Sequence, residues 1–214
     1  MAHPQKWLIA YNSVSASLWS IVLFNTLFLG TLIGQPYLFE KTNFVTTIIQ
    51  TCALVEVFNA LFGIVRASFF TTLMQVYSRL LVVWGIWQFL PESPANSHWS
   101  YITVSIAWSL SEIIKYSFHT TTLKGETPDW LVWLRYSAFL VLYPLGVSSE
   151  MIIMYLSLDV GKAVSEYYYY FIWANLVIYI PALVHLYTHL LRQRKKALGK
   201  LKAKGEKKDE KKNE

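Results

Sequence analysis

Two residues that can carry protons, Tyr143 and Glu150, lie seven positions apart inside a long apolar stretch of this chain. A carboxyl group at membrane depth costs roughly 2.5–3.5 kcal/mol on insertion scales, so residues of this kind usually have a function. No cation stands beside Glu150 in the sequence, and Pro144 and Gly146 between the two groups disturb a regular helix. An acid and a phenol on nearly the same helix face are suited to general acid–base chemistry, which makes this segment a candidate active site.

The spacing of these two groups predicts how a substrate would lie between them. Seven residues place the alpha carbons about 10.5 Å apart along a straight helix. Both side chains lean toward the N-terminus of the helix, so they do not converge on one point. We therefore expect them to flank a substrate that lies along the helix near Gly146, which has no side chain to obstruct it. For Tyr143 taken alone, an ordinary packed tyrosine is the alternative interpretation.

Five further ionisable residues lie inside apolar segments: Glu56, Arg79, Glu112, Lys115 and Arg135. Charges inside a membrane usually face the bundle interior and pair with one another, so one interpretation is structural ion pairs. We expect Glu56 to pair with Arg79 because both fall near mid-membrane. Glu112 and Lys115 are three positions apart on one helix, a spacing that allows contact. The other interpretation is that Lys115 and Arg135 receive an anionic head group from the cytosol.

The composition indicates a polytopic membrane protein with an all-α fold. Of the 214 residues, 54% are hydrophobic and only 15% are charged, against about 25% charged residues in an average soluble domain. Six apolar segments are long enough to cross a bilayer, and segments in lipid must be helical to satisfy their backbone groups. We therefore expect a bundle of six transmembrane helices, over residues 8–30, 44–64, 69–90, 99–121, 131–158 and 167–191.

The basic residues predict the orientation of the bundle. The segment from Arg192 to the end contains eleven Lys and Arg against four Asp and Glu, so it holds all the excess positive charge. The positive-inside rule makes this tail cytoplasmic, and six crossings put the N-terminus and the loops near Arg66 and Lys124 on the same side. This divides the chain into a transmembrane domain, residues 1–191, and a Lys-rich cytoplasmic tail, residues 192–214. No folded basic surface for nucleic acid is expected.

The tail ends with Lys211 and Lys212 at the fourth and third positions from the C-terminus. Such a pair resembles the dilysine signal that coat machinery reads for retrieval to the endoplasmic reticulum. In a tail so rich in lysine, the pair also arises by chance, and a solvated topology anchor is the alternative interpretation.

Other kinds of site find little support in the sequence. His185 and His189 have a spacing that can bind a metal on one helix face, but packing at the membrane interface explains them better. No Gly-x-Ser-x-Gly elbow and no glycine-rich phosphate loop occurs. We expect no metal site.

Several short motifs are spread over most of residues 7–190. They are Tyr11-Asn12 with Trp19, the run from Gln50 to Trp84 that includes Glu56, Arg66, Gln75, Ser78-Arg79 and Val83-Trp84, then Trp108 with Ser111-Glu112 and Tyr116-Ser117, and Leu134-Arg135-Tyr136. The most specific is Tyr143-Pro144-x-Gly146-x-x-x-Glu150. With these motifs together, the chain resembles the membrane 3-hydroxyacyl-CoA dehydratases of very-long-chain fatty acid elongation, also called the protein-tyrosine-phosphatase-like or PTPLA family. Lys115 stands where we would expect arginine.

The resemblance implies an enzyme of the endoplasmic reticulum membrane that dehydrates very-long-chain (3R)-3-hydroxyacyl-CoA to trans-2-enoyl-CoA, the third step of the elongation cycle. It implies that Tyr143 and Glu150 are the catalytic pair. We assign Glu150 as the base and Tyr143 as the acid, and the reverse order is the alternative. Substrate-binding or structural support is expected from Glu56, Gln75, Arg79, Glu112, Lys115, Arg135 and Gly146. Among these, Arg135, Lys115 and Arg79 are the candidates for binding the CoA phosphates or for holding the pocket open.

The resemblance also implies which molecules the protein works with. These are membrane lipid and the other elongation enzymes, namely the condensing enzyme, the ketoacyl reductase and the enoyl reductase, and no cofactor is implied. Phosphatase activity is not expected, because Cys52 is the only cysteine and no Cys-x5-Arg loop surrounds it. A non-catalytic membrane scaffold or a small proton-coupled transporter is the alternative, since either would use the same buried charges. The absence of internal repeats counts against a transporter.

Overall fold

The computed structural model describes residues 6–65 and 67–213, and this part of the chain folds into helices without a strand. Arg66, expected in a cytoplasmic loop, lies outside the described residues. In chain order the elements are α1 (Lys6–Leu32), α2 (Tyr37–Thr51), α3 (Leu54–Leu61), α4 (Phe69–Leu80), the π-helix η1 (Leu81–Gln88), the 3-10 helix η2 (Pro94–Ser97), α5 (Ser100–Lys124), α6 (Asp129–Ser137), α7 (Phe139–Leu156), α8 (Leu158–Val164) and α9 (Glu166–Asn213).

Several of the expected spans are built from two helical pieces. The span predicted at 44–64 consists of α2 and α3, which meet at Cys52 and Ala53. The span predicted at 69–90 is α4 continued by η1, and the span predicted at 131–158 is α6 followed by α7, with a break at Ala138. Hydropathy alone does not reveal such breaks, because each joined stretch as a whole is apolar enough to cross a membrane.

Five helical stretches of the described residues are long and apolar enough to cross a membrane. They are Lys6–Leu32, Tyr37–Leu61, Phe69–Gln88, Asp129–Leu156 and Glu166–Ala203. The expectation of an all-α membrane bundle is therefore confirmed, while one predicted span, that of α5, is not among the five.

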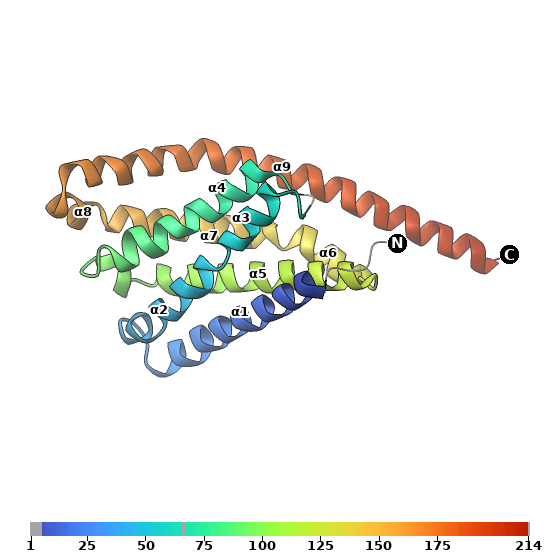
Figure 1. Ribbon diagram of the computed structural model, residues 1–214, viewed down its shortest axis with the longest axis horizontal. Helices are drawn as coiled ribbons and strands as arrows, with labels where there is room; N and C mark the ends of the chain where they lie inside the picture. The colour runs from blue at the N-terminus through green and yellow to red at the C-terminus, as the bar shows by residue number, and fades with distance from the viewer. Residues whose placement is uncertain (1–5, 66, 214) are drawn as a thin grey trace.

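Helix α5 owes its more polar composition to its central position. It packs against α1 on one side and α7 on the other, as Figure 1 shows. Its polar residues Ser100, Ser105, Ser109 and Glu112 are buried, so they face protein rather than lipid. A helix in this position does not need a uniformly apolar surface. It ends at Gly125, which takes the left-handed conformation that caps many helices.

Aromatic side chains form the centre of the bundle next to α5. Trp87 of η1 packs against Phe39 of α2, and against Tyr101 and Trp108 of α5, with ring centroids 5.0–6.1 Å apart. Trp19 of α1 is also fully buried. Large apolar side chains such as those of Phe24, Phe70 and Val141 are exposed instead, as expected for a surface in lipid. The aromatic cluster holds α5 in place, and Trp108 lies where this core meets the cavity described below.

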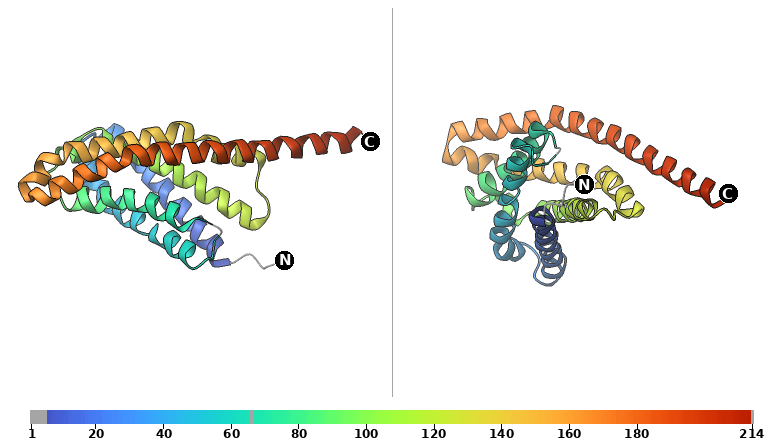
Figure 2. Two further views of the ribbon diagram at one scale, coloured as in Figure 1. Left: turned by 90° about the horizontal axis from the view of Figure 1, so that it is seen from above. Right: turned by 45° about the vertical axis from the view of Figure 1, so that its right-hand side comes forward.

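Helix α9 is the longest element and extends beyond the rest of the bundle. Figures 1 and 2 show it projecting past the other helices toward the C-terminus. It continues through the expected domain boundary at residue 191 without a break. Lys211 and Lys212 lie in its last turns, and their side chains are outside the described part of the chain. The start of α1 and the far end of α9 lie at the same end of the molecule (Figure 1).

Candidate active site

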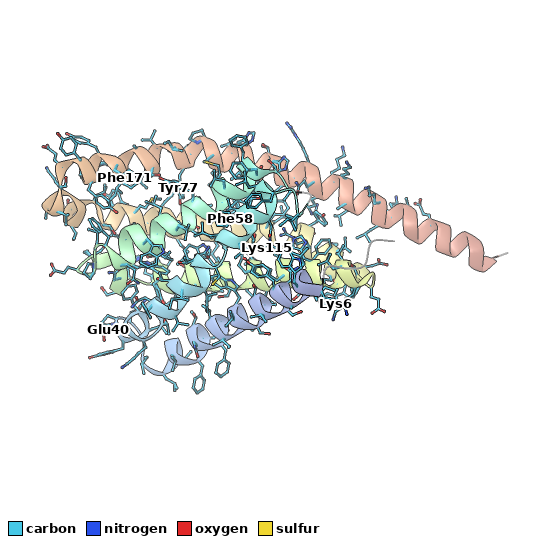
Figure 3. The ribbon with its side chains drawn as sticks, in the orientation of Figure 1. Lys6, Glu40, Phe58, Tyr77, Lys115 and Phe171 are labelled. Atoms are coloured by element: carbon cyan, nitrogen blue, oxygen red, sulfur yellow. The ribbon has the colours of Figure 1, made fainter. Side chains whose placement is uncertain are left out.

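A cavity of about 200 Å³ lies between α4, α5, α7 and α9, with single contributions from α2, α3 and α6. All nine residues that the sequence indicated line it: Glu56, Gln75, Arg79, Glu112, Lys115, Arg135, Tyr143, Gly146 and Glu150. Figure 3 shows Lys115 between Lys6 and Glu40 along the length of the bundle. The fold thus gathers residues from five helices around one space.

Two hydrogen bonds from other helices hold the carboxyl group of Glu150. The indole nitrogen Nε1 of Trp108 on α5 donates to Oε1 over 2.8 Å, and the hydroxyl of Tyr179 on α9 donates to Oε2 over 2.8 Å. Glu150 is only 5% exposed and has no ion-pair partner among the described residues. The acid is therefore held by neutral donors, and each donor fixes the position of one carboxyl oxygen.

Tyr143 lies two turns away on the same helix and has a freer environment. Its ring stacks on that of Tyr187 of α9, with centroids 6.1 Å apart and planes inclined by 25°. Its hydroxyl forms no hydrogen bond with any described residue, and its side chain lines the cavity. The phenol is thus available to a ligand, which favours the functional interpretation of Tyr143 over that of an ordinary packed tyrosine.

Contacts between α7 and α9 show how far along the cavity Tyr143 and Glu150 each lie. Glu150 is opposite Tyr179, and Tyr143 is opposite Tyr187, so the two helices run in opposite directions side by side. Gly146 lies between these two levels. A Cβ atom on Gly146 would lie 3.6 Å from the Cβ of Ala107 on α5, which is an ordinary packing distance. Because Gly146 has no side chain, the space between the acid and the phenol stays open.

Four of the remaining charged residues form a continuous chain of ion pairs along one wall. Arg79 of α4 pairs with Glu112 of α5, and Lys115 Nζ lies 2.5 Å from Glu112 Oε2. Lys115 also contacts Glu56 of α3 at 2.7 Å, and Tyr116 donates its hydroxyl hydrogen to Glu56. The expected contact between Glu112 and Lys115 is confirmed.

The expected pairing of Glu56 with Arg79 is wrong. Each of them has another partner, because α5 presents an acid and a base one turn apart on the face toward α3 and α4. Glu112 forms an ion pair with Arg79, and Lys115 forms one with Glu56. The prediction placed the helices of Glu56 and Arg79 side by side and left out α5, which supplies a partner of opposite charge to each of them.

Arg135 of α6 differs from the other two cations of the cavity. It lines the cavity, yet it forms no ion pair and no hydrogen bond with the described residues. Arg79 and Lys115, in contrast, are each bound to a carboxylate within the bundle. Among these three, Arg135 is the cation left for an anionic ligand.

Four further residues belong to the site although no role for them was predicted from the sequence. Trp108 and Tyr179 bind Glu150, and Tyr116 binds Glu56. Gln50 is fully buried and lines the cavity, and its side-chain amide has no partner among the described residues. Trp108 and Tyr116 stand in motif positions, and Gln50 is an amide in an apolar segment. Tyr179 had no such signal, since it is one of fourteen tyrosines in the chain.

Within the described residues, no three His, Cys, Asp or Glu side chains lie together as metal ligands would. His185 and His189 are exposed on α9, and neither of them lines the cavity.

A sequence profile of the family described as "Protein tyrosine phosphatase-like protein, PTPLA" matches residues 50–200. The chain belongs to this family. The matched region contains every residue that lines the cavity, so the site lies wholly in the part shared with the PTPLA family.

Several relatives align with most of this chain. The "Probable very-long-chain (3R)-3-hydroxyacyl-CoA dehydratase" of Schizosaccharomyces pombe is 39% identical over 200 residues, covering 89% of this chain and 92% of the relative. The "Very-long-chain (3R)-3-hydroxyacyl-CoA dehydratase PASTICCINO 2A" of Oryza sativa is 42% identical over 168 residues, covering 72% and 75%. The "Very-long-chain (3R)-3-hydroxyacyl-CoA dehydratase 1" of Mus musculus is 34% identical, covering 90% and 73%. No solved structure matches the chain.

Proposed function

We propose that this PTPLA-family protein removes water from very-long-chain (3R)-3-hydroxyacyl-CoA and forms trans-2-enoyl-CoA. The observation that carries the proposal is that Tyr143, with a hydroxyl free of any described partner, and Glu150 line one cavity inside an apolar bundle. The relatives whose names state this activity align with 72–92% of the chain, which supports the same substrate class here.

Glu150 acts as the base and Tyr143 as the acid. Both partners of Glu150 donate hydrogen bonds, which is the arrangement that a carboxylate accepts. The carboxylate removes the proton from C2, the electrons of that bond form the C2–C3 double bond, and the bond from C3 to its hydroxyl breaks. Tyr143 gives its proton to the departing hydroxyl, which leaves as water. The Tyr143 hydroxyl has no described partner to compete with the substrate.

The cations of the cavity divide into two roles. Arg135, which is free of a described partner, binds the phosphates of coenzyme A, for which a guanidinium group is well suited. Arg79 and Lys115 hold the pocket in shape, because both are committed to Glu112. This replaces the broader expectation in which all three cations were candidates for the phosphates.

Six spans place both termini in the cytoplasm, with α5 as the sixth span at the centre of the bundle. The start of α1 and the end of α9 lie at the same end of the molecule (Figure 1), as an even number of crossings requires. The Lys-rich end of α9 then lies on the cytosolic side of the endoplasmic reticulum membrane, where coat machinery reads Lys211 and Lys212. In this membrane the protein works beside the condensing enzyme and the two reductases of elongation.

Dehydration by the purified protein tests this function directly. The protein in nanodiscs is incubated with a long-chain (3R)-3-hydroxyacyl-CoA, and the loss of water is followed by mass spectrometry. Glu150→Gln and Tyr143→Phe are each expected to lower kcat by about 10²–10⁴-fold, as for the loss of a general acid or base. Glu40→Gln is the matched control, because Glu40 is exposed and outside the cavity. Wild-type protein without turnover, or Glu150→Gln at the wild-type rate, contradicts the assignment.

A further inference from the structure

Helices α4 and α9 form the wall of the cavity that reaches the outer surface of the bundle. Met74 and Tyr77 of α4 and Ile178 of α9 line the cavity and are nevertheless 44%, 42% and 52% exposed. The opposite wall is closed, since Trp108 and Glu150 are buried. A residue that lines a cavity and is also exposed marks the place where the cavity meets the surface.

The surface around this opening is mainly apolar. Phe70 on α4, one turn before Met74, is 75% exposed, and Met74 and Ile178 at the opening are apolar, while Gln75 adds one exposed polar side chain. Both helices belong to stretches long and apolar enough to cross a membrane. The opening therefore faces lipid and not water.

The seam between α4 and α9, where the two helices face each other across the cavity opening, is held by hydrogen bonds over only part of its length. Tyr77 donates to Asn175 Oδ1 over 3.1 Å, and Tyr179 approaches the backbone oxygen of Ser78 at 3.3 Å. Beyond Tyr179, toward the C-terminal end of α9, no hydrogen bond joins the two helices within the described residues. The lining side chains there are those of Thr72, Met74 and Gln75 on α4 and of Ala182, Leu183 and Leu186 on α9. Thr72 donates its hydroxyl hydrogen to the backbone oxygen of Ser68 at the start of its own helix, and Gln75 forms no side-chain hydrogen bond to α9 among the described residues. This part of the seam can separate without losing a polar contact.

The unbonded part of the seam lies level with the reacting groups. On α9, Tyr179 binds Glu150, and Tyr187, two turns further, stacks on Tyr143. Leu183 is midway between these two positions, so it lies opposite the space beside Gly146. Carbon atoms held between the acid and the phenol are therefore directly inside this part of the seam.

A long acyl chain does not fit inside the cavity. The cavity measures about 200 Å³, and a cavity of about 150 Å³ in another protein holds one benzene molecule. A tail that left through the cytosolic end would lose about 0.8 kcal/mol for each CH₂ group placed in water. A tail that passes into lipid meets no such cost.

We propose that the acyl tail leaves the cavity sideways between α4 and α9, past Met74 and Leu183, and lies in the surrounding lipid during the reaction. The proposal rests on the proposed function and specifies the path of its substrate. The coenzyme A group stays at the Arg135 end, and the carbon atoms that react stay between Tyr143 and Glu150. Beyond the two helices the tail contacts lipid, so the protein tolerates further lengthening of the chain.

Narrowing the seam tests this path. Leu183→Trp and Met74→Trp are compared on a six-carbon and a twenty-carbon 3-hydroxyacyl-CoA in nanodiscs. Each is expected to lower kcat/KM for the long substrate at least about tenfold more than for the short one. Val184→Trp is the matched control, because Val184 is 57% exposed and does not line the cavity. It is expected to leave kcat/KM unchanged for both substrates. A long substrate unaffected by both variants, or an equal loss on both substrates, overturns the path.

A photoreactive substrate tests the same path in the unaltered protein. A 3-hydroxyacyl-CoA with a diazirine at mid-tail is expected to label α4 and α9 around Met74 and Leu183. Labelling of the apolar groove outside α7 and α9, at Tyr155 and Trp173, overturns the proposal. Failure of the proposed function has a different signature, since wild-type protein would then dehydrate neither the short nor the long substrate.

Discussion

Tyr179 donates a hydrogen bond to Glu150 over 2.8 Å, although the two residues lie 29 positions apart on α9 and α7. Trp108 on α5 donates to the other carboxyl oxygen of Glu150 over the same distance. Three helices thus determine where one acid lies. A carboxyl group with both oxygens held cannot rotate away from a substrate, so its two donors position the proposed base.

Removing the hydroxyl of Tyr179 is expected to weaken catalysis more than substrate binding. A hydrogen bond to a charged group contributes about 1.5–3 kcal/mol, so Tyr179→Phe is expected to lower kcat by roughly tenfold to a hundredfold, with KM nearly unchanged. Tyr167→Phe, which alters a tyrosine of the same helix that is 88% exposed, serves as the control and should behave as wild type. A variant with a normal kcat and a raised KM would show that Tyr179 shapes the pocket and does not position Glu150.

Arg135 is expected to recognise the phosphates of coenzyme A. Arg135→Gln should raise KM for a 3-hydroxyacyl-CoA by roughly tenfold or more, because a hydrogen-bonded charge contact is lost. With the matching pantetheine thioester, which has no 3′-phosphate or diphosphate, KM should stay the same as in wild type. Arg192→Gln, at an exposed position outside the cavity, is the matched arginine control. An equal rise of KM for both thioesters would exclude phosphate recognition by Arg135.

Lys115 is expected to stabilise the fold through its two carboxylate partners. Lys115→Met leaves Glu56 and Glu112 without this cation, and breaking a buried pair by removing one partner costs about 3–5 kcal/mol. Thermal unfolding in detergent should show a clearly lowered midpoint, and Lys115→Arg should restore most of it. Lys202→Met removes a 3.9 Å pair between exposed side chains, so it should leave the midpoint unchanged. An unaltered midpoint in Lys115→Met would show that the pair is replaceable.

Gly146 is expected to tolerate one methyl group but not a large side chain. In Gly146→Ala the new Cβ meets Ala107 at an ordinary 3.6 Å, and alanine favours the helix by about 0.5–1 kcal/mol. Its unfolding midpoint should equal or exceed that of the wild type. Gly146→Leu places a branched side chain between Tyr143 and Glu150 and should lower kcat/KM at least about a hundredfold. Wild-type turnover in Gly146→Leu would show that the substrate does not pass this position.

Much of the candidate site follows from local features of the chain. Tyr143 and Glu150 share one helix, so their spacing alone predicts that a ligand lying along this helix meets both. Glu112 and Lys115 likewise share a helix, and their contact is confirmed. The partners of Glu56 and Arg79 were predicted incorrectly, because those residues come from two short elements whose side chains both turn toward α5. Contacts within one helix are determined by its regular geometry, whereas contacts between helices depend on rotation and depth.

By itself the sequence determined the class of protein, the helical nature of its spans and the pair of groups suited to proton transfer. These are properties of single residues and of their spacing along one helix, which the surrounding structure alters little. Only the tertiary structure decided which donors hold Glu150, which of the three cavity cations has no partner among the described residues, and where the cavity reaches the surface of the bundle. Apolar helix faces are nearly equivalent in lipid, so close packing and polar contacts select which faces meet. That selection is made by the whole bundle and leaves no local pattern in the chain.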